Sequence, residues 1–155
     1  MPTEHVPLEA ANGRVLAQDV AANRTQPPFA ASSMDGYALC RAEVEADAMF
    51  KLIGEAAAGH PFTGKLGAGQ AVRIFTGAPV PEGADIVVIQ EQVTRRGTLI
   101  TLDRGVDQKS NIRPAGADFN NGDVMLRAPR HLGPNDIALL AAMTFAMVPV
   151  SRKPR

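Results

Sequence analysis

Apolar residues along this chain form short runs that are separated by glycine and proline. The strongest run, 84–93 (ADIVVIQEQV), is β-branched and follows a Pro-Glu-Gly turn, so it predicts a strand. The next run, 97–102 (GTLITL), alternates apolar and polar residues and predicts the second strand of a hairpin that turns at 94–96. Further strands are predicted at 14–20, 123–126 and 147–150, and short apolar stretches occupy 48–55 and 70–75. The pattern therefore favours many short strands over long helices.

Two segments predict helices. Residues 133–143 (GPNDIALLAAM) begin with Pro134 and carry Asp136 in the first turn, where the helix macrodipole favours negative charge. Residues 7–13 (PLEAANG) have proline at the start and glycine just past the end, which predicts one short helix. The expected fold class is therefore mainly β or α+β.

The longer helix needs a surface to pack against, and the short helix is marginal by itself. We therefore expect 1–20 and 123–150 to form one small, elongated α+β unit from both chain ends, with Leu8 and Leu139 in the same core. The intervening 21–122 would form a separate β-rich domain of short strands. Residues 151–155 (SRKPR) are polar and basic, and they predict an exit from the domain.

Composition excludes several functional classes. The 155 residues are 45% hydrophobic, and 16 Lys and Arg balance 16 Asp and Glu, so no net field would attract nucleic acid or an anionic membrane. One cysteine, Cys40, allows no intrachain disulfide, and the first ten residues lack a signal-peptide core. We expect a cytoplasmic protein without nucleic-acid or membrane partners.

Common catalytic motifs are absent from the sequence. It contains no GxxxxGK[ST], GxGxxG, HExxH or GxSxG motif. His5, His60 and His131 occur singly, and with one cysteine a zinc site is not expected. We therefore assign no metal ligand within this chain.

The stretch 32–38 (SSMDGYA) contains a possible site residue, Asp35. Asp35-Gly36 is an ordinary turn signal, because Asp bonds its own backbone and Gly accepts positive φ. The large side chains of Met34 and Tyr37 flank the pair. Asp35 is therefore either a turn residue or a side chain presented to a ligand.

The stretch 73–85 (RIFTGAPVPEGAD) offers donors for an anion. The backbone N–H groups of Gly77 and Ala78 and the hydroxyl of Thr76 could converge on one, and the two prolines would fix the loop. The alternative is a rigid corner between strands, which this stretch alone favours.

The polar loop 110–123 carries two further candidates. Arg113 could bind a phosphate or another oxyanion through its planar guanidinium group, and Asp118 could orient water or a metal. The alternative is a solvated loop, which again is favoured when the segment is taken alone.

Taken together, these segments resemble one family. The motifs PPFAASSMDGYA (27–38), AVRIFTGAPVPEGADIVV (71–88, with QE following) and NIRPAGAD (111–118) occur in order, and the ending VPVSRKPR (148–155) also matches. The chain is similar to the N-terminal part of the molybdopterin molybdenumtransferases, to which the E domain of gephyrin is also similar. The resemblance covers nearly the whole chain.

The resemblance implies an activity and its partners. Family members insert molybdate into adenylylated molybdopterin and release AMP in molybdenum cofactor synthesis. They act as homodimers, and Mg²⁺ is the implied cofactor, with ligands mostly outside this chain. Family members also carry a preceding helical segment and a following Gly/Ser-rich module, so the chain is expected to be a fragment that is inactive alone. It would supply one wall of the active-site cleft.

The resemblance also assigns residues. Asp35 matches the aspartate of MDGYA that faces the cleft and Thr76 the threonine of TGAPVP, so both are catalytic candidates. The expected substrate contacts are Ser33, Met34, Gly36, Gly77, Ala78, Arg113 and Asp118. Ala117 stands where the family usually has Glu, and Thr144 where it usually has Gly. A β-rich scaffold or protein-interaction module without catalysis remains the alternative function.

Overall fold

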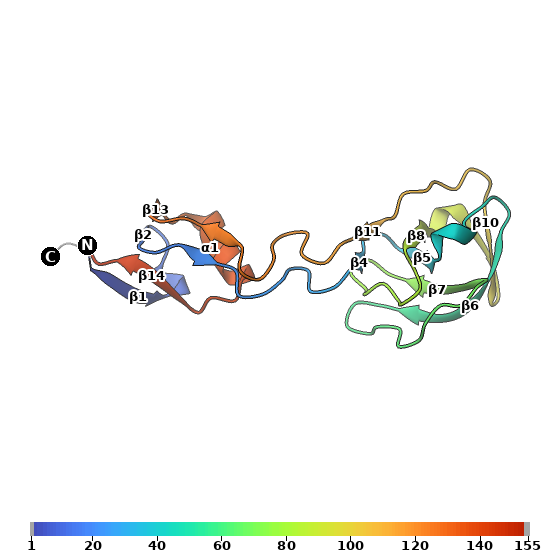
Figure 1. Ribbon diagram of the computed structural model, residues 1–155, viewed down its shortest axis with the longest axis horizontal. Coiled ribbons are helices and arrows are strands. Elements are labelled where there is room, and N and C mark those ends of the chain that lie inside the picture. Colours follow the sequence, from blue (N-terminus) through green and yellow to red (C-terminus); the bar gives the residue numbers. More distant parts are fainter. Residues whose placement is uncertain (1, 154–155) are drawn as a thin grey trace. The chain divides into compact units, whose positions relative to one another are not determined.

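The computed structural model describes residues 2–153 and divides the chain into two compact units (Figure 1). Unit 1 combines the chain up to Gln26 with the chain from Asp118 onward, and unit 2 is Pro27–Ala117. These divisions lie within six residues of those expected at 20/21 and 122/123. The described residues contain many strands and a single α-helix, which confirms the expected fold class.

Unit 1 is built around a four-stranded antiparallel sheet. In sheet order its strands are β1 (Thr3–Pro7), β14 (Met147–Ser151), β2 (Val15–Leu16) and β13 (Arg130–His131). Strand β3 (Val20–Ala21) pairs separately with β12 (Val124–Leu126). Leu8 and Leu139 both pack against one core cluster that includes Leu16, Leu140 and Val148. Unit 1 therefore depends on pairing between residues far apart in the sequence.

The helix α1 (Pro134–Ala142) begins as its sequence predicts. Asp136 is buried at its first turn and accepts a hydrogen bond from the Gly133 N–H at 3.0 Å. Its other carboxylate oxygen forms an ion pair with Arg130 at 2.9 Å. After the helix, Thr144 adopts φ 65°, the left-handed conformation that glycine adopts most readily. No helix in residues 2–153 has the length and apolar character needed to span a membrane.

Unit 2 contains a six-stranded sheet in which only the β6–β7 pair is parallel. In sheet order the strands are β8 (Ile86–Ile89), β5 (Gly36–Leu39), β7 (Gln70–Ile74), β6 (Met49–Ala56), β10 (Leu99–Leu102) and β9 (Val93–Arg96). A separate pair joins β4 (Ala31–Ser32) to β11 (Ile112–Arg113). Two short 3-10 helices, η2 (Arg41–Glu43) and η3 (Gln90–Gln92), complete the unit.

The central strands of the six-stranded sheet are apolar on both faces. Successive side chains of a strand point to opposite faces. On β5, Tyr37 and Leu39 belong to one buried cluster and Ala38 to another. On β8, Val87 likewise belongs to a different cluster from its neighbours. The central strands are therefore held from both sides, which fixes the strand ends where the candidate residues lie.

Three predicted elements were wrong in detail. Residues 7–13 form only the 3-10 helix η1 (Leu8–Ala10), and the run 14–20 is interrupted between β2 and β3. The run 84–93 contains β8, η3 and the start of β9, and it is β9 that pairs with β10. The hairpin turn therefore falls at Gly97 and Thr98, because residues 94–96 are themselves strand.

Gly36 does not supply the positive φ expected of an Asp-Gly turn. It is a buried residue of β5 and is absent from the positive-φ glycines of the described chain. A Cβ at this position would lie 2.0 Å from the carbonyl oxygen of Val88 on the neighbouring strand. Glycine is therefore required here because two backbones approach closely.

Candidate functional site

Two candidates from separate motifs meet at one end of the six-stranded sheet. Asp35 directly precedes β5, and Thr76 follows β7. Because these strands are antiparallel, with Gly36 opposite Ile74, the start of one lies beside the end of the other. The Asp35 Oδ1 atom accepts hydrogen bonds from the Thr76 N–H at 2.8 Å and from the Thr76 hydroxyl at 2.9 Å. The fold thus joins the two motifs through a direct pair.

Backbone contacts hold the loop that carries Asp35. The Ser33 N–H donates to the Asn111 carbonyl at 2.9 Å, and the Gln90 N–H donates to the Asp35 carbonyl at 3.1 Å. The buried Ser32 hydroxyl donates to the Met34 carbonyl at 2.6 Å. The position of Asp35 is therefore fixed from several sides.

The surroundings of Asp35 favour its ionised form. The Thr76 N–H and then the Thr76 hydroxyl lower the pKa of the Asp35 carboxyl, and the positive charge of Arg73 lowers it further. These contributions outweigh the smaller opposing effect of desolvation. At neutral pH Asp35 is a carboxylate with one oxygen occupied by Thr76.

An open pocket of about 410 Å³ adjoins this pair. It is lined by Met34, Asp35, Thr76, Ile89, Gln90 and Glu91. The lining includes two carboxylates, one amide and one hydroxyl, and Met34 is 47% exposed. Such a site can orient water or a cation-bound ligand, whereas a bare anion would meet repulsion from the two carboxylates.

Of the two arrangements considered for residues 76–78, the convergence of donors on an anion is not formed. The Gly77 N–H donates to the Ser32 carbonyl at 2.8 Å, and the Ala78 N–H donates to the Phe75 carbonyl at 3.0 Å. The Thr76 hydroxyl donates to Asp35. The loop uses these donors to fix itself against its neighbours. That Gly77 and Ala78 contact a substrate stays a prediction.

Residues 1–144 match the family model of the MoeA N-terminal region, domain I and II. The chain belongs to this family. Over 153 residues it is 38% identical to a molybdopterin molybdenumtransferase of Haemophilus influenzae, a match that covers 97% of this chain and 38% of the relative. A relative of the same name from Bacillus subtilis is 38% identical over 161 residues, and the match covers 98% of this chain and 37% of that protein.

A solved structure shows the same fold. The crystal structure of the molybdopterin biosynthesis MoeA protein from Pyrococcus horikoshii OT3 matches this chain with a TM-score of 0.91 at 37% identity. The match covers 99% of this chain and 42% of that protein. This MoeA N-terminal region therefore spans about two fifths of the length of the relatives that it matches.

The remaining sequence candidates lie at different places in this MoeA region. Ser33 is exposed beside Met34, whereas Gly36 is buried. Arg113 is exposed on β11 and is not among the described residues that line the pocket. Asp118 belongs to unit 1, where its N–H donates to the Gln26 carbonyl at 2.9 Å. Their substrate-binding roles stay predictions.

Sequence reasoning missed three residues around the pocket. Gln90 and Glu91 line it from η3, and the Gln90 side-chain amide donates to Glu91 at 3.2 Å. Arg73 lies close enough for its positive charge to lower the pKa of the Asp35 carboxyl. The Gln-Glu pair after the strand was a visible signal, but only the fold shows that η3 follows β8 to the edge of this pocket.

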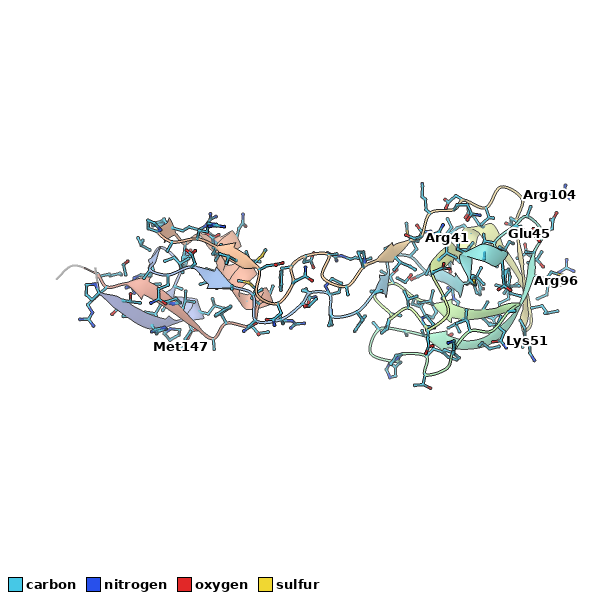
Figure 2. All side chains as sticks on the ribbon, in the orientation of Figure 1. Arg41, Glu45, Lys51, Arg96, Arg104 and Met147 are labelled. Carbon is cyan, nitrogen blue, oxygen red and sulfur yellow. The ribbon has the colours of Figure 1, made fainter. Side chains whose placement is uncertain are left out.

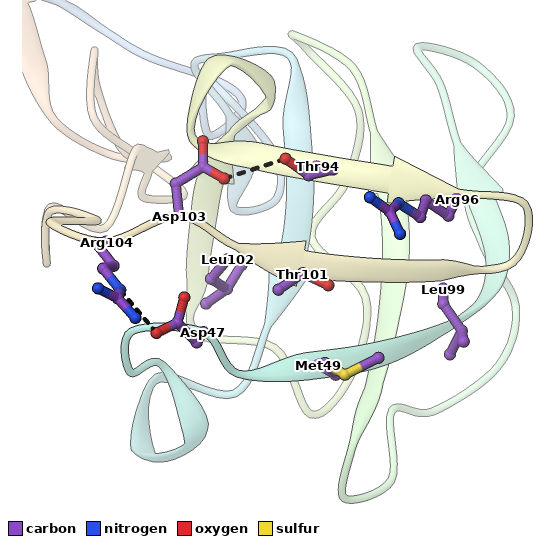
Figure 3. Close-up of a pocket in the computed structure, with 9 residues that line it drawn as sticks. All are labelled: Asp47, Met49, Thr94, Arg96, Leu99, Thr101, Leu102, Asp103 and Arg104. Atoms are coloured by element: carbon purple, nitrogen blue, oxygen red, sulfur yellow. Dashed lines mark hydrogen bonds and ion pairs between the residues drawn. The ribbon is translucent and has the colours of Figure 1, made fainter.

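A second pocket of about 620 Å³ lies on the outer side of β6, β10 and β9, where Figure 2 shows the labelled Arg96 and Arg104. Two interactions pair four of its polar side chains (Figure 3). Arg104 pairs with Asp47 at 3.0 Å, and the Thr94 hydroxyl donates to Asp103 at 3.2 Å. The Asp103–Thr94 pair resembles Asp35–Thr76 in chemistry, but it lies in this other pocket, so it serves as an internal control.

Proposed function

We propose that this MoeA N-terminal region forms one wall of the active site of a molybdenumtransferase, which inserts molybdate into adenylylated molybdopterin and releases AMP. The observation that carries the proposal is the Asp35–Thr76 pair at the pocket. The two residues belong to separate motifs, and the family resemblance makes each a catalytic candidate. The names of the relatives support the same reaction class.

The role proposed for Asp35 follows from its charge. A carboxylate repels the phosphoryl and molybdate oxygens, so it acts on water or on a bound cation and not directly on the anion. Within residues 2–153, Oδ1 accepts both Thr76 hydrogen bonds and Oδ2 accepts none. Thr76 thus orients the carboxylate, and Oδ2 is the atom that holds a water or a hydrated cation.

Mg²⁺ is the cofactor that we propose, with most of its ligands supplied from outside this chain. Its preferred ligands are carboxylate oxygens and water. Asp35 and Glu91 are two such groups on one pocket, but no group of three potential metal ligands occurs among the described residues. Bound Mg²⁺ would neutralise charge on the phosphates, and Asp35 and Glu91 would help to hold it through water.

The resemblance also supports a cytoplasmic homodimer as the working form.

Breaking a phosphoanhydride requires cations and oriented donors around the phosphates. This pocket offers mainly acceptors, so the cationic part of the cleft is assigned to segments outside this chain. We expect the isolated chain to be inactive for this reason.

A non-catalytic scaffold is the second candidate function. The internal use of the donors at 76–78 favours it, because a rigid corner would show the same hydrogen bonds. A scaffold tolerates Asn at Asp35, since the amide oxygen can accept the same two bonds from Thr76. A catalytic wall does not tolerate the loss of charge.

The test uses a chimera in which this chain replaces the matching segment of the Haemophilus influenzae relative. Asp35→Asn and Thr76→Ala are each expected to lower AMP release by tenfold or more, because loss of a group aimed at the reacting centre costs about 3 kcal/mol in the transition state. Both positions are exposed, so the unfolding midpoint should change by little, in line with surface changes within about 0.5 kcal/mol. Rates and midpoints are measured on the same preparations.

The matched controls are Asp103→Asn and Thr94→Ala, which alter the equivalent pair of the second pocket. They are expected to leave the rate unchanged. Wild-type rates in both Asp35→Asn and Thr76→Ala would refute the catalytic proposal and favour the scaffold. A chimera of wild-type sequence that folds but releases no AMP would also count against it.

A further inference from the structure

Arg73 lies beside the pocket but is not one of its lining residues among those described. On β7 it lies two positions after Ala71, a member of the cluster that contains Tyr37, so it faces the same side of the sheet. Its guanidinium carbon lies 5.1 Å from the centroid of the Tyr37 ring and 4.6 Å from that of Phe75. The two aromatic rings hold this cation at the end of an apolar face.

Two hydrogen bonds connect Arg73 to the pocket. One terminal nitrogen donates to the Gly36 carbonyl at 3.2 Å, and the other donates to the Gln90 side-chain oxygen at 2.6 Å. Gly36 follows Asp35 in sequence, and the Gln90 N–H donates to the Asp35 carbonyl at 3.1 Å. Arg73 therefore binds groups on both sides of Asp35.

The same contacts extend to Glu91. With its oxygen bound by Arg73, the Gln90 side-chain amide turns its nitrogen to Glu91, at 3.2 Å. The orientation of Gln90 thus determines which group it offers to Glu91. One guanidinium group influences three pocket residues: Asp35, Gln90 and Glu91.

We propose that Arg73 is the positioning residue of the Asp35–Thr76 pocket. It ties the backbone beside Asp35 to the η3 segment and sets the orientation of Gln90, without touching the substrate. The role requires arginine, because its planar guanidinium group can donate hydrogen bonds in two directions while its face stacks on aromatic rings. Lysine would keep the charge but not both bonds and the stacking. The inference rests on the proposed function for its effect on turnover only.

A purely structural role makes a different prediction. If Arg73 only covered the end of the apolar face, its replacement would lower stability and leave the pocket unchanged. A positioning role predicts altered signals from Asp35 and Gln90, in addition to any change in stability. The two roles are separated by observing these residues directly.

The experiment compares Arg73→Gln and Arg73→Lys with Arg95→Gln, an exposed control whose guanidinium donates to the Gly97 carbonyl of its own turn. NMR on this chain follows the titration of the Asp35 carboxyl and the side-chain amide signals of Gln90. Arg73→Gln should raise the titration midpoint of Asp35 and shift the Gln90 signals. Arg73→Lys should largely keep the midpoint and still shift Gln90. Arg95→Gln should change neither.

Turnover in the chimera supplies the second readout. Both Arg73 variants should lower kcat by tenfold or more, with a smaller change in KM, since the residue does not contact substrate. Unfolding midpoints identify any variant that fails to fold, and Arg73→Lys is the milder replacement if Arg73→Gln does.

Three results would overturn the inference. The first is that Asp35 and Gln90 signals in both Arg73 variants match those of Arg95→Gln. The second is that Gln90 does not move in Arg73→Lys, which would leave only an effect of charge. The third is an active chimera whose kcat neither variant changes. Absence of turnover in the wild-type chimera counts against the proposed function instead, and the NMR comparison then decides the role of Arg73.

Discussion

At the scale of single residues, Asp35 and Gly36 show what a dipeptide signal can and cannot predict. The Asp-Gly pair indicated a turn, and resemblance assigned Asp35 to the cleft. The contact with Thr76 could not be predicted, because it depends on which strands become neighbours. Gly36 was interpreted as a source of positive φ, whereas it allows the approach of the Val88 carbonyl. Local preference was visible in the sequence, but close contact between distant residues was not.

Gly36→Ala tests this interpretation. The added methyl group would meet a backbone oxygen at 2.0 Å, and the backbone of β8 cannot move away as a flexible side chain could. We expect a loss of about 3 kcal/mol in the free energy of unfolding, at the upper end of overpacking effects. Denaturant unfolding of the purified variant measures it.

Gly97→Ala is the comparison. Gly97 has φ 61° in the β9–β10 turn, and nothing lies within 4 Å of an added Cβ there. Its replacement should cost about 1 kcal/mol, from backbone strain alone. Equal losses at the two positions would contradict the packing explanation for Gly36.

At the scale of elements, the residues typical of a helix start predicted α1 well. The pattern of apolar residues predicted the hairpin poorly. Pro134 and Asp136 lie where proline and acidic residues favour a helix start. The run 84–93 contained enough apolar residues for one strand. In the structure the 3-10 helix η3 interrupts this run, and a new strand, β9, begins after it. Apolar content does not reveal such an interruption, because Val93 contributes to the core from the second strand as Val88 does from the first.

Asp136→Asn should make the stability of unit 1 less dependent on pH. The Arg130 guanidinium and then the Gly133 N–H lower the pKa of Asp136 in the folded chain. Since the folded pKa is depressed, this stabilisation is present above the unfolded pKa of about 4 and is lost as pH falls through the folded value. We expect the variant to be less stable by about 1 kcal/mol at neutral pH.

The difference between wild type and variant should begin to shrink as pH falls below about 4, where the unfolded carboxyl takes up a proton, and should continue to shrink as pH falls through the lower folded pKa of Asp136. Urea unfolding at a series of pH values, followed by signals from residues of α1, checks this. A difference that stays constant from neutral pH to pH 3 would mean that the charge of Asp136 contributes nothing.

At the scale of the whole molecule, the apolar surface of the longer predicted helix was the reason to expect that the two chain ends pack together. The helix required a partner, and Leu8 and Leu139 do share a core cluster. The division between units was expected a few residues away from its observed place, since residues 21–26 and 118–122 carry only a few scattered apolar residues and give no clear boundary. Hydrogen bonds mark the boundary instead. The Gly116 N–H donates to the Pro27 carbonyl at 2.9 Å within unit 2.

Residues 27–117 are therefore expected to fold as a separate polypeptide. They are continuous in sequence, their ends are joined by that hydrogen bond, and both faces of their sheet carry buried clusters. Amide spectra of this segment should overlay those of the same residues in the whole chain, and thermal unfolding should be cooperative. Spectra with collapsed dispersion would show that unit 2 depends on unit 1.

The pairing of β1 with β14, in which Thr3 lies opposite Ser151, has a consequence for synthesis on the ribosome. Strand β1 leaves the ribosome well before β14 and has no partner in its sheet until β14 has been translated. Unit 2, by contrast, is complete once Ala117 leaves the exit tunnel. Domains generally fold as units during translation. Unit 2 is thus able to reach its native form while β1 is still waiting, without a strand partner, for β14.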